Sequence, residues 1–361
     1  MNNWSNAISG KRILVTGGTG SIGTELVKWL LQASPKVVRI YSRDESKQFA
    51  MRKAFAQYTN VRFLIGDVRD RERLHRAFED VDIVFHLAAM KHVESCEYNP
   101  FEAIKTNVFG TQNVIDCALE RGIEKVLFSS TDKAVNPTNS MGASKLMAER
   151  LITAAHYHRG PHKTVFCAVR FGNVLNTSCS VIPVFLDRLK TGLPLEITDP
   201  EMTRFLVTMT EAVHLLLEAV CVAQGGEIFC RLMPVVRVID LASVLAEALK
   251  IPVRYEIIGP KPGEKLCEEL YTEEESRRTY KAKDLFIVTP QLVTELQLPK
   301  GATPVAPVAL SSRDIQSIKP RAIFKLLKDE GIFLHEEITN YLLQSQPESQ
   351  PQYQHQQGVW A

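Results

Sequence analysis

The sequence has few of the features that mark a secreted, membrane or metal-binding protein. Its seven cysteines are odd in number and never spaced C-x-x-C, so they favour neither a disulfide framework nor a zinc site. No run reaches the roughly 18 apolar residues of a membrane span, and the N-terminus lacks the basic and apolar regions of a secretion signal. We therefore expect a cytoplasmic protein in a reducing compartment, with no metal and no membrane partner.

The charge balance argues against nucleic acid as a partner. Lysine and arginine total 43 and aspartate and glutamate 41, which gives a net charge of +2, and no basic run is long enough to follow a phosphate backbone. With 361 residues, 45% hydrophobic and 23% charged, the composition is that of a globular protein. Only residues 344–361, rich in Gln, Ser and Pro, read as a disordered tail.

Short apolar segments alternate with longer helical patterns through the first half of the chain. Such alternation predicts βαβ units and an α/β fold, a Rossmann-like doubly wound parallel sheet with a smaller C-terminal α/β lobe for substrate. The rhythm changes near residue 175. We expect residues 1–175 to form the nucleotide-binding domain, with later segments returning to it, and 176–343 to form mainly the substrate lobe. The expected strands are 13–16, 37–41, 61–65, 83–87, 126–129 and 165–169.

A glycine triplet follows the first expected strand and precedes a helical pattern at 24–32. The spacing of Gly17, Gly20 and Gly23 allows a tight turn, a close approach of the backbone to a pyrophosphate, and close packing of the next helix. In this context the triplet predicts a dinucleotide site. The residues expected to hold the pyrophosphate are Gly17, Thr19, Gly20, Ser21, Ile22 and Gly23.

The ends of later strands refine the expected cofactor. After the second strand, Ser42 and Arg43 stand where an acidic residue usually binds the ribose, and a guanidinium there favours the 2′-phosphate of NADP. Asp44 beside them keeps NAD open, as the less favoured choice. Small or acidic residues at the next strand ends trace the rest of the crevice: Asp67, Val68, Leu87, Ala88 and Ala89.

A carboxyl group and an amine are adjacent at the end of the fifth strand. Asp132 and Lys133 would project into a crevice that excludes water, where coupling of their pKa values can give one acid and one base. Lys145 lies on a helical pattern at 141–154 that follows. A surface ion pair is the bland alternative, but the position beside the nicotinamide end favours chemistry.

From about Lys11 to Glu275 the chain resembles the extended short-chain dehydrogenase/reductases, and within them the UDP-N-acetylglucosamine 4,6-dehydratases. The resemblance implies NADP-assisted loss of water from a UDP-sugar: oxidation at C4, removal of the C5 proton, loss of the C6 hydroxyl and return of hydride to C6, with inversion at C5 left open. The supporting strings are Ser42–Glu45, Ala88–Val93, Ser130–Ala134, Arg170–Val174, Thr198–Phe205 and Pro262–Lys265.

The resemblance also implies residue roles. Lys133 would take the C5 proton, Asp132 would act as the acid at O6, and Thr131 would bind near O4. Lys145 would hold the nicotinamide ribose, and the chain would form a homo-oligomer. The positions implied for the UDP-sugar are Lys91, Asn173, Arg204 and Glu264.

One position departs from the superfamily. Met141 stands where a tyrosine usually acts as the base for the C4 hydroxyl, and a thioether cannot titrate. Either Thr131, Asp132 or water replaces that base, which we favour because Asp132, Lys133 and Lys145 remain, or the chain only binds its ligands. A dehydratase forming a 5,6-alkene, a 4-epimerase and a non-catalytic NADP-binding sensor are therefore the alternatives.

Overall fold

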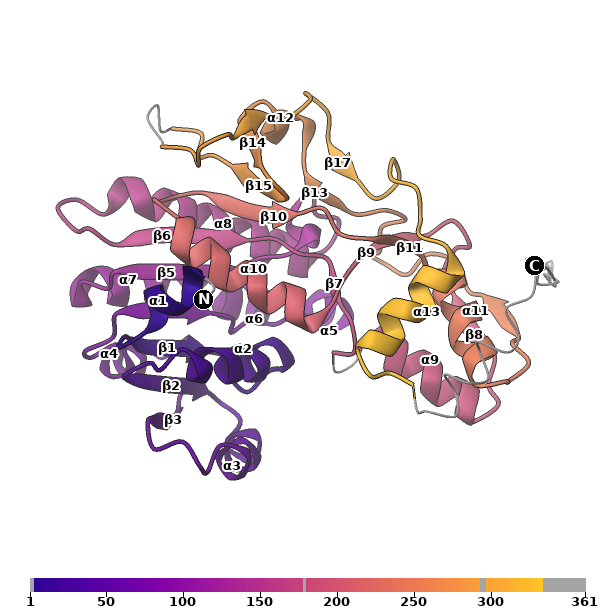
Figure 1. Cartoon of the computed structure of the whole chain (residues 1–361), viewed down its shortest axis with the longest axis horizontal. Helices are drawn as coiled ribbons and strands as arrows, with labels where there is room; N and C mark the ends of the chain where they lie inside the picture. The colour runs from indigo at the N-terminus through magenta and orange to yellow at the C-terminus, as the bar shows by residue number, and fades with distance from the viewer. Residues whose placement is uncertain (1–2, 178–179, 293–296, 334–361) are drawn as a thin grey trace.

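The computed structural model describes residues 3–177, 180–292 and 297–333, and the predicted C-terminal tail lies outside them. Within these residues the main sheet has ten strands, in the order β16-β14-β15-β10-β6-β5-β4-β1-β2-β3 (Figure 1). Strands β10 to β3 of this order run parallel, and β15, β14 and β16 extend the sheet in antiparallel fashion. The strands are β1 (Arg12–Thr16), β2 (Val37–Ser42), β3 (Val61–Ile65), β4 (Ile83–His86), β5 (Lys125–Ser129), β6 (Val165–Val169), β10 (Ile228–Arg231), β14 (Thr279–Ala282), β15 (Leu285–Val288) and β16 (Thr303–Pro304).

The sheet confirms the α/β fold predicted from the sequence, and the six expected strands are β1 to β6. Strands in the middle of the sheet are apolar along their whole length because helices cover both faces. All four residues of β4 are buried, as are four of the five residues of β1, β5 and β6. This continuous burial, without polar alternation, is what the short apolar segments of the sequence indicated.

Helices form two groups around the sheet. One contains α1 (Asn3–Ile8), α2 (Ser21–Gln32) and α10 (Met209–Val222), which contact one another, with α10 in front of the sheet in Figure 1. The other contains α4 (Arg71–Ala77), α7 (Gly110–Arg121) and α8 (Ser140–His158), where α7 contacts both of its neighbours. The shorter helices around them are α3 (Glu45–Ala54), α5 (Val93–Tyr98), α6 (Pro100–Ala103) and the π-helix η1 (Ile104–Phe109).

Local sequence sets the positions of these helices. In α2 the residues Leu26, Val27, Leu30 and Leu31 are buried, and their spacing places them on one stripe facing the sheet. Helix α7 ends where Gly122 takes a left-handed conformation, with φ of 63°, which closes the helix with little strain.

The later part of the chain forms a lobe with a hydrophobic core of its own. Strands β8 and β12 pair in parallel there, beside three helices that lie at the opposite end of the molecule from β2 and β3 (Figure 1). Strands β10, β14 and β15 nevertheless return to the main sheet. The remaining elements are β7 (Asn173–Val174), β8 (Leu195–Ile197), β9 (Thr203–Val207), β11 (Val235–Arg237), β12 (Tyr255–Ile257), β13 (Glu269–Tyr271), β17 (Leu310–Ser311), η2 (Asp132–Ala134), α9 (Val181–Lys190), α11 (Val238–Ala248), α12 (Glu273–Ser276) and α13 (Pro320–Asp329).

A buried ion triad ties the first half of the chain to the second. Arg170, directly after β6, has no exposed surface, and its guanidinium donates to Glu149 of α8 and to Glu275 of α12. Although burial opposes the charge, the hydrogen bonds from Arg170 lower the pKa of Glu275 to about 2. Arg170 also donates to the carbonyl of Leu270, so it fixes β13 and α12 against the main sheet.

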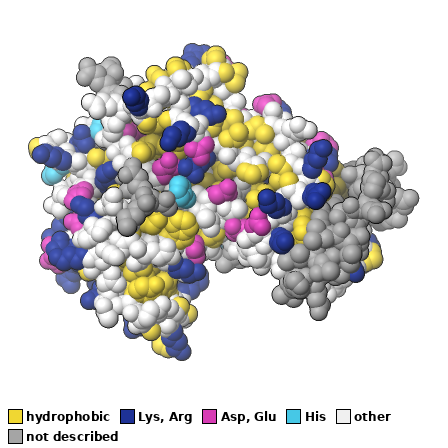
Figure 2. All heavy atoms as spheres, in the orientation of Figure 1, with side chains coloured by type: hydrophobic (Ala, Val, Ile, Leu, Met, Phe, Trp, Pro, Cys, Tyr) yellow, Lys and Arg dark blue, Asp and Glu magenta, His cyan; other side chains and the backbone are white. Residues whose placement is uncertain are grey.

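On the face drawn in Figure 2, basic and acidic side chains are mixed and form no continuous stripe of one sign. None of the helices in the described ranges is long and apolar enough to cross a membrane.

Candidate active site

The loop after β1 is shaped by contacts that only glycine permits. Gly17 has φ of 68°, and a Cβ atom on it would lie 2.7 Å from the backbone nitrogen of Ala88. A Cβ on Gly23 would lie 2.6 Å from the carbonyl oxygen of Gly17. Gly20 is the N-cap of α2 and supplies no side chain to cap the helix. The first turn of α2 is therefore packed tightly against the loop while its N-terminus can receive an anion.

Arg43 and Asp67 lie together at the ends of β2 and β3. The Arg43 side chain is 56% exposed, and its Nη1 is 3.4 Å from Asp67 Oδ2. Arg69 also donates to the Asp67 carboxylate from its backbone and from its guanidinium. Burial opposes this charge, but the hydrogen bonds from Arg69 and the charge of Arg43 hold the pKa of Asp67 below its ordinary value.

The neighbouring Asp44 has a structural partner. Its side chain caps α3 by accepting a hydrogen bond from the backbone N–H of Lys47, 2.9 Å away, and it forms an ion pair with the Lys47 ammonium. The carboxylate is thus turned toward its own helix, and Arg43 carries the accessible charge at this strand end.

Thr131, Asp132 and Lys133 form a hydrogen-bonded cluster after β5. Asp132 is fully buried, and its Oδ1 accepts from Thr131 Oγ1 at 3.0 Å and from Lys133 Nζ at 3.1 Å. Its second oxygen, Oδ2, is buried with no hydrogen-bond partner among the described residues. The structure therefore brings together the acid and the base that the sequence placed side by side, with an unused carboxylate oxygen between them.

Two further residues reach Lys133 from distant parts of the chain. Lys133 Nζ donates to Asn173 Oδ1 at 3.3 Å and lies 3.4 Å from Glu268 Oε1. Burial opposes the charge on Lys133, but the carboxylates of Asp132 and Glu268 outweigh that effect and raise the pKa of Lys133. Lys133 is therefore an ammonium in this arrangement and must lose a proton before it can act as a base.

Lys145 lies on α8 with its ammonium group buried. Its Nζ donates to the carbonyl of Ser129 at 2.7 Å and lies 4.5 Å from the centre of the Phe128 ring. Burial lowers the pKa of Lys145 to about 8, although Glu149 and Cys96 act in the opposite direction. This lysine is fixed against the end of β5, on the same strand end that leads into Thr131.

Met141 lies in an apolar cluster rather than among the polar side chains. It is in the first turn of α8, is 4% exposed, and packs with Cys96 and Ala103. The next residue, Gly142, approaches the Lys133 loop so closely that a Cβ on it would lie 2.2 Å from the carbonyl oxygen of Lys133. The start of α8 thus presses on the catalytic loop without placing a titratable group at position 141.

Asn107 is a buried polar residue that the sequence analysis did not single out. Within η1, its side chain accepts from the backbone N–H of Met90 and donates to the carbonyl of Met90 and to Ser144 Oγ. It therefore fixes the loop after β4, which contains Ala88 and Ala89, to helix α8. A lone Asn inside a helical pattern gave no signal for this role.

The expected UDP-sugar residues divide into two groups. Asn173 contacts Lys133, whereas Arg204 pairs with Glu264 at 3.4 Å and also donates to the carbonyls of Thr203, Lys265 and Leu266. Glu264 accepts a second hydrogen bond, from Thr198. Arg204 therefore holds the segment around Glu264 in place. Lys91 is exposed in the loop after β4, and its role stays a prediction.

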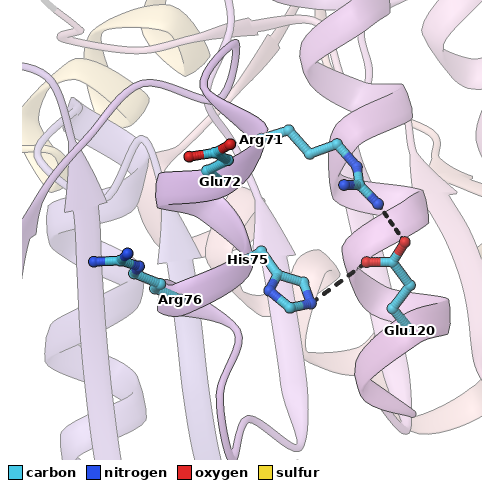
Figure 3. A pocket seen from close by; sticks show the side chains of 5 residues that line it. All are labelled: Arg71, Glu72, His75, Arg76 and Glu120. Carbon is cyan, nitrogen blue, oxygen red and sulfur yellow. Dashed lines mark hydrogen bonds and ion pairs between the residues drawn. The ribbon is translucent and has the colours of Figure 1, made fainter.

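A surface hollow between α4 and α7 offers less chemistry. Figure 3 shows Arg71 and His75 both directed at Glu120, and these groups form ion pairs. The hollow has no buried carboxylate or free amine, and its lining residues come from different elements than the cluster around Lys133. Among the described residues there is also no group of three or more His, Cys, Asp or Glu suited to a metal ion.

Comparison with known proteins gives a consistent picture. Residues 13–290 match the family described as polysaccharide biosynthesis protein. The chain is 47% identical over 332 residues to an uncharacterised protein of Methanocaldococcus jannaschii that is named as a membrane protein, covering 90% of this chain and 97% of that one. It is 44% identical over 284 residues to an inverting UDP-N-acetylglucosamine 4,6-dehydratase of Campylobacter jejuni, covering 78% and 84%. A UDP-glucose 4-epimerase of Rickettsia typhi is 41% identical over 279 residues, covering 76% and 81%.

Solved structures agree on the fold. The X-ray structure of Pen from Bacillus thuringiensis superposes with a TM-score of 0.86 at 43% identity and covers 90% of this chain and 99% of that one. A dTDP-glucose 4,6-dehydratase of Streptomyces venezuelae, solved with NAD bound, superposes with a TM-score of 0.64 at 25% identity and covers 71% and 86%.

Proposed function

The chain belongs to the polysaccharide biosynthesis protein family and is an enzyme of the nucleotide-sugar dehydratase and epimerase class, and from this premise we propose that it is an NADP-dependent UDP-N-acetylglucosamine 4,6-dehydratase. One observation carries the choice of reaction. A buried carboxyl group, Asp132, and an amine, Lys133, are in direct contact at 3.1 Å at the end of β5. Removal of the C5 proton and loss of the C6 hydroxyl require such a base and acid side by side.

The residues divide the work as follows. Lys133, once neutral, takes the proton from C5, which a neighbouring ketone at C4 makes acidic. Asp132 delivers a proton to O6, so that the hydroxyl leaves as water. Thr131 donates to Asp132 and lies beside the position of O4, and Asn173 keeps the Lys133 amine in place. A reprotonation on either face of C5 is compatible with this geometry, which leaves the configuration of the product to experiment.

The glycine loop is suited to a dinucleotide cofactor. The close packing at Gly17 and Gly23 leaves no room for side chains between the loop and α2, and the N-terminus of α2 has no side-chain cap. When bound, the cofactor supplies a hydride acceptor for C4 and a hydride donor for C6. Arg43 favours NADP because its guanidinium is accessible while Asp44 caps α3. Lys145 would hold the nicotinamide ribose.

Met141 requires another route for the proton of the C4 hydroxyl. Its side chain is buried with Cys96 and Ala103 and has no group that titrates. Thr131 or Asp132, or water held between them, is positioned to receive this proton. The alternative of a non-catalytic sensor rests on Met141 alone, while Asp132, Lys133 and Lys145 all keep the environment of reactive groups.

A 4-epimerase is the second candidate, since a relative at 41% identity carries that name. An epimerase needs no acid at O6, and Asp132 in contact with Lys133 is the observation against it. A third outcome, a 5,6-alkene, uses the same two residues but returns hydride to C4.

Product analysis separates these reactions. The protein is incubated with NADP and either UDP-N-acetylglucosamine or UDP-glucose, and the sugar is followed by proton NMR. We expect a new C6 methyl doublet from UDP-N-acetylglucosamine. Vinyl protons would instead show the 5,6-dehydratase, and conversion limited to the C4 configuration would show the epimerase. An unchanged sugar with bound NADP would support the sensor.

Self-association, the domain boundary near residue 175 and a cytoplasmic location stay predictions. For self-association we propose the helical surface where α5, α6 and α8 meet η1, elements that contact one another. Large apolar side chains exposed on these elements are Tyr98, Phe101, Ile104, Phe109 and Met147.

A further inference from the structure

Glu268 is a buried carboxylate beside the catalytic lysine that no motif in the sequence indicated. Its residue is 2% exposed, and Oε1 lies 3.4 Å from Lys133 Nζ. The other oxygen, Oε2, has no hydrogen-bond partner among the described residues, although Lys265 Nζ lies 3.6 Å from it. A carboxylate is costly to bury unless its charge is compensated. The pairing with Lys133 provides that compensation inside the proposed active site.

The backbone around Glu268 is fixed independently of Lys133. Its N–H donates to Ser312 Oγ, and the N–H of Ser312 donates back to the carbonyl of Glu268. Further along, Arg170 binds the carbonyl of Leu270. The carboxylate is thus held in position by contacts that do not involve the amine it faces.

On the assumption that the proposed dehydratase function is correct, we propose that Glu268 is a positioning residue that holds Lys133 Nζ between two carboxylates and accepts its proton when the neutral amine forms. Asp132 lies on the other side of the same nitrogen, at 3.1 Å. Two carboxylates therefore share one lysine. Because Asp132 is needed at O6, Glu268 is the group left to control the charge of the amine.

The proton balance of this step is simple. One N–H bond of the Lys133 ammonium breaks and one O–H bond forms on Glu268 Oε1, which leaves a lone pair on the amine and removes both charges. The C5–H bond then breaks, and its proton goes to that lone pair while the electron pair enters the C4–C5 enolate. Lys133 can pass this proton to Asp132, from which it reaches O6 as the C6–O bond breaks and water leaves. No oxidant or reductant enters these steps.

The charges around Lys133 support this direction of transfer. The groups that face it are Asp132 from η2, Glu268, and Arg204 from β9, while Lys265 faces Glu268 from its far side. Burial raises the pKa of Glu268, against the influence of Lys133, so its carboxylate is a better proton acceptor than an exposed one. The Lys133 side chain is still 21% exposed, and a substrate that covers it would favour the uncharged pair by removing water.

The test measures Lys133 itself, in the protein without substrate. The protein is labelled with [ε-13C]lysine, and the Lys133 signal is assigned by its loss in Lys133→Arg. We expect Glu268→Gln to lower the pKa of Lys133 by at least about one unit, because one of two opposite charges within about 4 Å is removed. Glu269→Gln is the matched control: it removes the same charge from the next residue, whose carboxylate accepts from Asn136 instead. It should leave the Lys133 titration unchanged.

A kinetic readout follows from the same change. Deuterium exchange at C5 of UDP-N-acetylglucosamine requires neutral Lys133, so its rate rises with pH through the Lys133 pKa. In Glu268→Gln this rising limb should move to lower pH by the same amount as the titration, with a lower plateau since the proton acceptor is gone. Glu268→Asp retains the charge and should restore the position of the limb in part; it also serves if Glu268→Gln does not fold.

The outcomes are separable. An unchanged Lys133 titration in a folded Glu268→Gln or Glu268→Asp protein would overturn the role of Glu268. If the titration shifts as expected but the wild-type protein converts no UDP-N-acetylglucosamine, the proposed reaction fails while the electrostatic control of Lys133 by Glu268 stands. A loss of turnover with no shift in either pH dependence would show that Glu268 only supports the fold.

Discussion

The glycine loop and the cluster around Lys133 are built in opposite ways. The loop from Gly17 to Gly23 is seven residues long, and its shape depends on side chains that are absent, since a Cβ at either end would collide with the backbone. The cluster depends on side chains that are present and come from segments far apart, with Glu268 135 residues from Lys133. The difference indicates that cofactor binding is encoded locally, while the proposed chemistry depends on the assembled fold.

Replacement of Lys133 should have the largest effect, confined to one side of this comparison. In Lys133→Met we expect C5 exchange to fall by about 10²- to 10⁴-fold, the usual contribution of a general base, while NADP binding is retained. Deuterium incorporation and a cofactor titration measure the two properties. Lys163→Met, at an exposed lysine, is the control. Full exchange in Lys133→Met would assign the base to another group.

The Arg170 triad tests whether the cluster depends on long-range contacts. Arg170→Met leaves Glu149 and Glu275 buried without their partner, so we expect the free energy of unfolding to fall by about 3–5 kcal/mol. Arg150→Met is the matched control, because that side chain is 38% exposed and lies 3.8 Å from Glu275; it should cost less than about 1 kcal/mol. Denaturant unfolding gives both values, and equal losses would remove the special role of the buried arginine.

On the cofactor side, Arg43 is expected to set the preference between NADP and NAD. Arg43→Ala removes hydrogen bonds to a charged phosphate, worth about 1.5–3 kcal/mol, so NADP should bind roughly 10- to 150-fold more weakly while NAD binding is little changed. Isothermal titration with both cofactors measures this. Lys47→Ala removes a nearby charge of the same sign and should have the smaller effect. An equal loss for both cofactors would contradict recognition of the 2′-phosphate.

Gly23→Ala is expected to have the smallest effect, because the backbone can yield in part. The added Cβ would lie within 2.7 Å of Gly17 and Gly18 atoms, which costs about 1–3 kcal/mol of overpacking. NADP affinity should fall by roughly 5- to 150-fold, with the Lys133 titration unchanged. Thr24→Ala, one residue along the same helix, should bind NADP normally. A shifted Lys133 titration would mean that the two regions are coupled.

The sequence predicted what is local in this molecule. Strands β1 to β6, the turn at Gly17 and the adjacency of Asp132 and Lys133 follow from apolar runs, glycine spacing and chain neighbours. Arg43 could be placed at a strand end, but the turning of Asp44 into the cap of α3 required the structure, because a capping role and a ribose contact use the same residue type.

The long-range contacts could not be predicted in the same way. Glu268 and Asn107 reach the site from a late loop and from a π-helix, and a single carboxylate or amide in such segments has no periodic signature. Arg204 was expected to contact phosphate, yet in the structure its donors hold the segment around Glu264. Sequence identifies chemically capable residues; the partners that set their charge come from tertiary packing.

The most direct measurement of the central claim is the isotope pattern of the product formed in D2O. The protein is incubated with UDP-N-acetylglucosamine and NADP, and the product is examined by proton NMR and mass spectrometry. The account predicts a C6 methyl group together with one deuterium at C5, because Lys133 removes the original C5 proton and solvent exchanges with the amine before reprotonation. A 4-epimer or reduced sugar that retains its C5 proton, formed at a full rate, would contradict the assignment of Asp132 and Lys133 to C5 and C6 chemistry.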